Sequence, residues 1–166
     1  MNLRFLNETD AKLYQELRLK ALLINPEAFG STYEREKAFT LEMIEKRLKP
    51  TEDKFVMGFF DNHVLVSMLT FIRESNFKTV HKGNVFGMFV LPEKRGQGIG
   101  KAILLELIKV AKNMTGLEQI KLTVVSENKA AKSLYQSIGF EVYGVERNAL
   151  KFNEQYFDEE LMVLYI

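Results

Sequence analysis

Apolar residues recur at helical spacing in the first third of the chain. We expect one helix to be capped by Asp10 and to end before Pro26, and a second to start at Thr40 and end before Pro50. The inward positions of the first are Leu13, Leu17, Ala21 and Leu22. Those of the second are Leu41, Ile44 and Leu48. A short strand over residues 2–5 precedes both helices.

The pattern changes to β-rich runs in the middle of the chain. Runs at 55–60 and 64–72 are separated by Asp61-Asn62-His63, which is typical of a hairpin turn. A third apolar run covers 84–90 and has Gly87 at its centre. A glycine inside a strand weakens pairing unless a bulge or a close backbone approach uses it. We therefore expect an irregularity at Gly87, or a tightly packed glycine.

The second half alternates helices and strands. A helix over 99–114 presents one apolar face, and a strand at 120–124 follows it. The apolar face of this helix consists of Ile103, Leu104, Leu107, Ile108 and Ala111. A helix over 128–137 is closed by Gly139. Two more strands complete the chain, at 140–145 and 156–165. This order of elements predicts an α/β (α+β) fold, a mixed sheet of about seven strands with helices on both faces.

Composition limits the classes of function. Residues 1–166 suit a single domain, with 46% hydrophobic and 27% charged residues. The chain has no Cys, which excludes disulfides, cysteine metal ligands and a cysteinyl intermediate, and agrees with a cytoplasmic location. No stretch reaches the ~20 apolar residues needed to span a bilayer. A net charge of +1 does not favour nucleic acid as a partner.

A glycine-rich turn at 91–101 joins the strand at 84–90 to the strongest predicted helix. Unpaired N–H groups at a helix N-terminus carry partial positive charge, so they favour a phosphate. Arg95 and Lys101 add positive charge at this turn. We therefore expect a phosphorylated ligand.

Two common phosphate motifs do not match this turn. A P-loop needs glycine where Arg95 lies and Ser or Thr where Ala102 lies, and the dinucleotide fingerprint lacks its third glycine. The turn instead resembles the pyrophosphate signature of the GNAT superfamily of acetyltransferases, Arg/Gln-x-x-Gly-x-Gly/Ala. Arg95, Gly98 and Gly100 match it.

A second segment strengthens the resemblance. Residues 128–140 read Asn-Lys-Ala-Ala-Lys-Ser-Leu-Tyr-Gln-Ser-Ile-Gly-Phe, which is similar to the superfamily pattern Asn-x-x-Ala-x-x-Leu-Tyr-x-x-x-Gly-Phe. The two motifs fall on consecutive strand-helix units. The resemblance is specific from about residue 85 to the C-terminus, and covers the N-terminal half only by its order of elements.

The resemblance implies a mostly antiparallel sheet in which two parallel strands, 84–90 and 119–125, splay apart around acetyl-CoA, with a bulge near Gly87. It also implies transfer of an acetyl group to a primary amine by direct attack in a ternary complex, without a metal. The implied cofactor-binding residues are Phe89, Val90, Arg95, Gly96, Gln97, Gly98, Ile99, Gly100, Lys101, Asn128 and Tyr135. Tyr135 is also the implied general acid, although without the resemblance a packed core tyrosine is the better interpretation. Asn128 also suits an N-cap.

The sequence leaves several questions open. The strand at 84–90 lacks the carboxylate that many relatives use as general base, so Glu34, Glu36, Glu74, His81 or a water relay remain, although exposed loop charge is the better interpretation of each. We expect segments 25–50 and 147–157 to set the acceptor. A CoA-binding sensor without turnover and a basic adaptor using Lys94, Arg95 and Lys101 are alternatives. Donors such as succinyl-CoA and a homodimer also stay possible.

Overall fold

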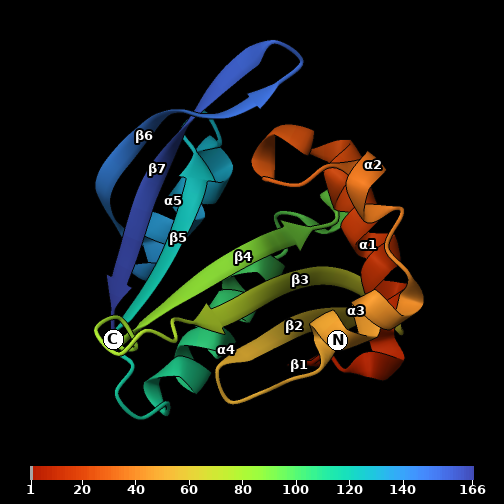
Figure 1. The fold of residues 1–166 in the computed structure, drawn as a ribbon, viewed down its shortest axis with the longest axis horizontal. Helices are drawn as coiled ribbons and strands as arrows, with labels where there is room; N and C mark the ends of the chain where they lie inside the picture. Colours follow the sequence, from red (N-terminus) through yellow and green to blue (C-terminus); the bar gives the residue numbers. More distant parts are fainter. Residues whose placement is uncertain (1) are drawn as a thin grey trace.

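One seven-stranded sheet, in the order β1-β2-β3-β4-β5-β7-β6, organises the chain in a computed structural model that describes residues 2–166 (Figure 1). The strands are β1 (Asn2–Phe5), β2 (Lys54–Asp61), β3 (Val64–Arg73), β4 (Lys82–Val90), β5 (Gln119–Val125), β6 (Glu141–Phe152) and β7 (Gln155–Tyr165). Neighbouring strands run antiparallel except for the parallel pair β4 and β5. The predicted mixed, mostly antiparallel sheet is confirmed.

Helices cover both faces of this sheet. The helices are α1 (Ala11–Ile24), α2 (Tyr33–Glu36), α3 (Leu41–Leu48), α4 (Ile99–Lys112) and α5 (Lys129–Ile138). Short 3-10 helices are η1 (Glu8–Asp10), η2 (Pro26–Ala28) and η3 (Pro92–Lys94). Helices α4 and α5 pack on one face in the larger core cluster, and α1 and α3 pack on the other in a second cluster. On this second face, α1 to α3 lie over the β2 to β4 side of the sheet (Figure 1).

Strands β4 and β5 separate soon after they begin. Their pairing is confined to Lys82–Asn84 on β4 and Gln119–Lys121 on β5, and beyond it the two ribbons diverge (Figure 1). On the other edge of β4, Phe86 pairs with Thr70 and Phe89 with Met68, so two residues of β4 oppose one of β3. Gly87 lies in this bulge with φ +59°. The predicted splay and the irregularity at Gly87 are both present.

The first helix differs from its prediction. The Asp10 side chain does not cap α1, because it accepts a hydrogen bond from the Asn7 amide (3.0 Å) and pairs with Arg4 (2.7 Å). Leu13 is 38% exposed, whereas Arg18 lies in the buried stripe of the helix. The second prediction fails in the same way at Leu41, which is 45% exposed. Helical spacing located both helices but assigned one exposed residue to the buried face of each, Leu13 in α1 and Leu41 in α3.

Several local signals correctly set the ends of elements. Thr40 caps α3 through the Met43 amide, Asn128 caps α5, and Gly139 ends α5 in the left-handed region at φ +111°. The predicted inward face of α4 is fully buried. Strand β6, in contrast, extends to Phe152 because it pairs with β7 on both sides of an irregularity after Glu146. Within residues 2–166, no helix is both long enough and apolar enough to cross a membrane.

Candidate active site

A cavity of about 630 Å³ occupies the opening between β4 and β5. The end of β4, the glycine turn, the start of α4 and the first turns of α5 line it, together with η2 and Phe157 of β7. The volume is in the ordinary range for a small-molecule site. All but one of the predicted cofactor-binding residues line it, namely Phe89, Val90, Arg95, Gly96, Gly98, Ile99, Gly100, Lys101, Asn128 and Tyr135.

The glycine turn forms an open cradle of backbone amides. Gly96 and Gly98 adopt φ +74° and +78°, and a Cβ added to either would meet no atom within 4 Å. Gly98 is the N-cap of α4, and its carbonyl accepts the first helical hydrogen bond, from Ala102. The amides before Ala102 are therefore the unpaired ones of a helix start. This space and these donors fit a pyrophosphate such as that of CoA.

Close packing of α4 and α5 explains the second motif glycine, Gly100. A Cβ added to Gly100 would lie 3.1 Å from Leu134 Cδ2 and 3.4 Å from Met88 Cε. The first of these contacts would require the Leu134 side chain to move by a few tenths of an ångström. Gly100 therefore keeps α4 close to α5 and β4 at the base of the cavity.

The polar side chains of the turn hold the loop itself. Arg95 donates to the Val90 carbonyl (3.0 Å) and to Asn25 Oδ1 (2.9 Å), which joins the turn to the loop after α1. Gln97 Nε2 donates to the Glu93 carbonyl, and Gln97 is the one predicted cofactor-binding residue outside the cavity lining. Its short-range bond to η3 turns the side chain away from the amides.

The structure supports a basic adaptor surface at Lys94, Arg95 and Lys101 less than it supports a ligand-binding cavity. Lys94 pairs with Asp61 at 2.7 Å, and Arg95 is engaged within the loop. Lys101 is exposed at the start of α4. Two of the three cations proposed for such a surface therefore already have partners in the chain.

Tyr135 reaches across the cavity from α5 to β4. Its hydroxyl lies 3.6 Å from Met88 Sδ, in the segment where β4 carries its bulge. Burial raises the pKa of Tyr135 to about 12, so the hydroxyl is protonated at neutral pH. Asn128 accepts from the Ala131 amide at 3.2 Å and thus also acts as the N-cap of the same helix.

A second cavity, of about 460 Å³, adjoins the first. It lies between the segment from η2 to α2 and the β6–β7 hairpin, and both cavities are lined by Glu27 and Phe29. Leu150 of this cavity is the cross-strand partner of Phe157 in the first. The expected acceptor segments, 25–50 and 147–157, therefore meet beside the first cavity.

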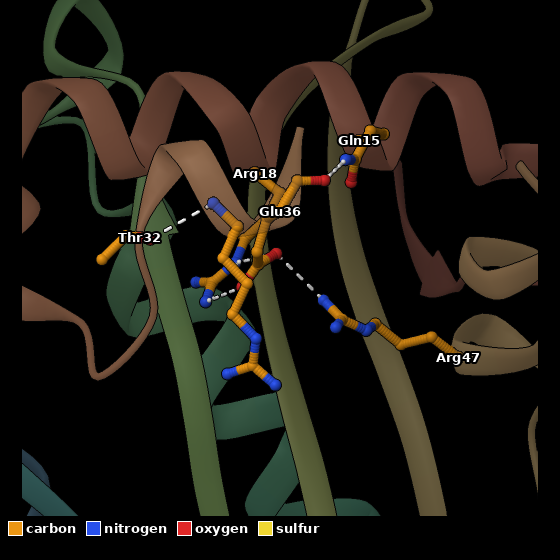
Figure 2. Close-up of polar contacts among 6 residues, drawn as sticks. Gln15, Arg18, Thr32, Glu36 and Arg47 are labelled. Atoms are coloured by element: carbon orange, nitrogen blue, oxygen red, sulfur yellow. Dashed lines mark hydrogen bonds and ion pairs between the residues drawn. The ribbon is translucent and has the colours of Figure 1, made fainter. Parts of the chain in front are cut away.

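A buried ionic cluster lies at the end of α2, the helix whose residues Tyr33 and Glu34 line the second cavity. Glu36 is 2% exposed. Figure 2 shows its carboxylate between the side chains of Arg18 from α1 and Arg47 from α3. Arg18 Nη2 lies 2.9 Å from Glu36 Oε1, and Arg47 Nη1 lies 3.1 Å from Oε2. Burial alone would raise the pKa of Glu36, but the hydrogen bonds and charge of Arg18, with the charge of Arg47, lower it overall.

The same cluster connects three parts of the site. The Arg18 guanidinium stacks on the Phe29 ring, 4.8 Å from its centroid, and Phe29 separates the two cavities. A Cβ added to Gly87 would lie 3.4 Å from Arg18 Nη1, so Arg18 also reaches the bulge of β4. Gln15 Nε2 donates to the Glu36 carbonyl at 2.7 Å (Figure 2). Sequence reasoning missed this cluster, although a charged residue inside an apolar helical stripe was its signal.

The structure narrows the list of general bases. Glu36 is not an exposed loop charge, and its pairing with two arginines and its lowered pKa make it a poor base. Glu74 and His81 lie near the start of β4, where Glu74 accepts from Asn84, at the end where β4 and β5 stay paired. Glu34 is exposed, as predicted, beside the second cavity. Within residues 2–166 no group of His, Asp or Glu is arranged for a metal.

Comparison with known proteins agrees with this fold and site. Residues 3–161 match the acetyltransferase (GNAT) domain family. The chain therefore belongs to the GNAT family of acetyltransferases. The resemblance of the two motifs is confirmed by a match that also covers the N-terminal half.

Relatives of the chain are N-acetyltransferases of varied specificity. The uncharacterized N-acetyltransferase MJ1207 of Methanocaldococcus jannaschii is 29% identical over 154 residues, 90% of this chain and 64% of that protein. The L-amino acid N-acetyltransferase AaaT of Escherichia coli is 30% identical over 77 residues, 46% of this chain and 48% of AaaT. The chain thus matches about half of AaaT, and 18% of a mycothiol acetyltransferase of Paenarthrobacter aurescens.

Solved structures share the fold over the whole chain. A GNAT acetyltransferase of Streptococcus pneumoniae superposes with a TM-score of 0.89 at 21% identity, over 99% of both chains. The putative acetyltransferase yncA of Salmonella typhimurium, solved with its cofactor acetyl-CoA, gives 0.81 at 22% identity, over 99% of this chain and 93% of its own. At these identities the likeness concerns the fold alone.

Proposed function

We propose that the protein is an acetyl-CoA-dependent N-acetyltransferase that acetylates a primary amine of a small molecule, peptide or protein by direct attack in a ternary complex. The observation that carries this proposal is the pair of adjoining cavities that meet at Glu27 and Phe29. One carries the glycine cradle and the buried tyrosine. The other is formed by segments outside the two motifs, as an acceptor site requires.

Backbone groups of this chain would hold the donor. The cradle at Gly96 and Gly98 suits the pyrophosphate, with Lys101 adding positive charge. Beyond Asn84 the edge of β4 that faces β5 has no strand partner, so the backbone at Phe89 and Val90 is available to the amides of the pantetheine arm. A β4 amide near the bulge would then stabilise the thioester oxygen as negative charge develops.

Tyr135 is placed to assist the leaving sulfur. The amine nitrogen forms a bond to the thioester carbonyl carbon, the carbon–sulfur bond breaks, and the sulfur leaves as a thiolate. The Tyr135 hydroxyl donates a proton to that thiolate and recovers one released by the nitrogen. A pKa of about 12 keeps the hydroxyl protonated until the sulfur develops charge. Tyr135 is therefore proposed as the general acid.

Thiol release from acetyl-CoA tests the proposal. The purified protein is assayed with a panel of polyamines, aminoglycosides, amino acids and peptides, and acetyl-CoA binding is measured by calorimetry. L-amino acids have priority because AaaT is named for them. Amine-dependent thiol release with a matching acetylated product is expected. Failure to bind acetyl-CoA would contradict the proposal altogether.

A CoA-binding sensor without turnover is the second candidate function. It is favoured by one observation, namely that residues 85–90 of β4 contain no Asp or Glu beside the acyl end of the cavity. Such a sensor binds acetyl-CoA but releases no thiol with any amine of the panel. The cytoplasmic location and a homodimer stay predictions.

A further inference from the structure

The second cavity has apolar walls. Leu150 and Phe152 of β6 line it and are half-buried, yet within residues 2–166 they belong to neither core cluster. They are two positions apart on the strand, so they share one face of the β6–β7 hairpin. The facing segment contributes Phe29, and α1 contributes Leu23, which is 60% exposed. Apolar side chains that line a cavity without packing into a core suit a ligand with an apolar body.

Glu27 is the carboxylate that the two cavities share. It lies on η2, which packs against β5 and β6, and it lines both cavities. Asn25 Nδ2 donates to Glu27 Oε1 at 3.3 Å, and Asn25 Oδ1 accepts from Arg95 of the glycine turn at 2.9 Å. Within residues 2–166, Glu27 forms no salt bridge. A positioned carboxylate with acceptor capacity left is suited to bind an ammonium group.

The second cavity offers no free cation among residues 2–166. Its one basic lining residue is Lys151, whose ammonium pairs with Glu154 at 3.0 Å and lies 5.4 Å from the centroid of the Tyr156 ring. Lys151 and Tyr156 are cross-strand partners, so they lie on the face of the hairpin opposite to the apolar one. A substrate carboxylate beside the amine would therefore meet Glu27 and Glu34 without a compensating charge.

We infer that the acceptor of the proposed acetyl transfer is a primary amine on an aromatic or aliphatic body, with no carboxylate beside the nitrogen, and that Glu27 binds its ammonium. The inference rests on the proposed function. The body packs against Phe29, Leu150 and Phe152, and the nitrogen lies at the border with the first cavity. A polyamine would instead place a second ammonium against apolar walls, where its charge is poorly solvated.

Matched acceptors test this class in the thiol-release assay. Phenethylamine should have a kcat/KM at least about 10-fold above that of L-phenylalanine, which adds a carboxylate to the same body, and above that of spermidine. From butylamine to hexylamine, KM should fall about fourfold per methylene as more apolar surface is buried. An equal or higher kcat/KM for L-phenylalanine or spermidine would overturn the inferred class.

The role of Glu27 is tested with phenethylamine as the acceptor. Glu27→Gln should raise KM about 10- to 100-fold, because a hydrogen bond between two charged groups is lost, and should change kcat by less than about threefold. Glu16→Gln is the control, since Glu16 is exposed on α1 and lines neither cavity. Glu27→Asp should recover part of the lost affinity. The same KM in Glu27→Gln and Glu16→Gln would remove Glu27 from the acceptor site.

The apolar wall is tested on the hairpin. Phe152→Ala should reduce the preference for phenethylamine over butylamine about 5- to 10-fold, whereas Tyr156→Ala, on the opposite face, should keep it. Acetyl-CoA binding in calorimetry shows that each variant is folded. A preference that survives Phe152→Ala would overturn the inferred wall and leave the acetyltransferase activity established. Absence of thiol release from the wild type with every amine would instead overturn the proposed function, and the inference with it.

Discussion

The proposed cofactor wall and the proposed acceptor wall of this site, called below the cofactor wall and the acceptor wall, are built in different ways. On the cofactor side, backbone amides and glycine conformations at Gly96 and Gly98 form the proposed binding surface, and their geometry is set within one short turn, which Arg95 also ties to Asn25. On the acceptor side, Glu36 is held between Arg18 and Arg47, which come from two other helices. The first wall is encoded in a short stretch of chain, whereas the second needs three separate elements.

This difference determines which substitutions should disrupt each wall. A backbone cradle fails when a side chain intrudes on the ligand, but the fold around it survives. A buried ion pair fails when one partner is removed, because the other charge is left in a poorly solvated site. Changes on the cofactor side should therefore affect binding and rate, and changes in the cluster should affect stability and acceptor use.

The largest effect is expected at Arg18. Arg18→Met leaves the Glu36 carboxylate with Arg47 alone and should lower the free energy of unfolding by about 3–5 kcal/mol in urea titrations. The exposed pair Glu42–Lys46 supplies the control, since Lys46→Met should cost about 0.5 kcal/mol or less. The acceptor KM should rise while acetyl-CoA affinity changes little. Equal stability losses in the two variants would contradict the distinction between the walls.

Tyr135 tests the chemistry of the cofactor wall. Tyr135→Phe keeps the buried ring but removes the hydroxyl, so kcat should fall by about two orders of magnitude while acetyl-CoA affinity is nearly unchanged. Because burial raises the pKa of Tyr135 to about 12, the wild-type rate should show no loss through this group up to about pH 10. A variant that retains the wild-type kcat would remove Tyr135 from the mechanism.

Gly98 tests the cradle itself. Gly98→Glu places a negative charge among the amides expected to bind pyrophosphate, and acetyl-CoA affinity should fall about 10- to 100-fold by calorimetry. Gly98→Ala is the matched variant, because it carries the same cost of a positive φ without the charge. Affinity that falls equally in both variants would point to backbone strain and away from a phosphate site.

The smallest effect is the acid dependence of the acceptor wall. Glu36 has a lowered pKa in the folded protein, so its stabilisation is present above the unfolded pKa of about 4.3 and is lost as pH falls through the folded value. The difference in free energy of unfolding between wild type and Glu36→Gln should narrow below about pH 4. Glu42→Gln, in the exposed pair, is expected to show no such trend. A difference that stays constant with pH would mean that Glu36 does not titrate in this range.

Most of the cofactor wall was predictable from the sequence because its determinants are local. Glycines at fixed offsets allow the turn, Asn128 caps α5 through a residue three positions away, and Gly139 ends the helix. A glycine inside an apolar strand indicated either a bulge or a tightly packed glycine at Gly87, and the structure has the bulge. Gln97 was the exception, since spacing alone does not show which way a loop side chain turns.

The sequence by itself determined the order of elements and the glycine turn, because periodicity and turn chemistry act between residues close along the chain. The splayed strand pair followed from the resemblance of two motifs to a known family. Only the tertiary structure decided that Glu36 is buried between two arginines and that the β6–β7 hairpin meets η2. These contacts join residues far apart in sequence, and their energy depends on burial and charge that arise only once the sheet and helices have packed.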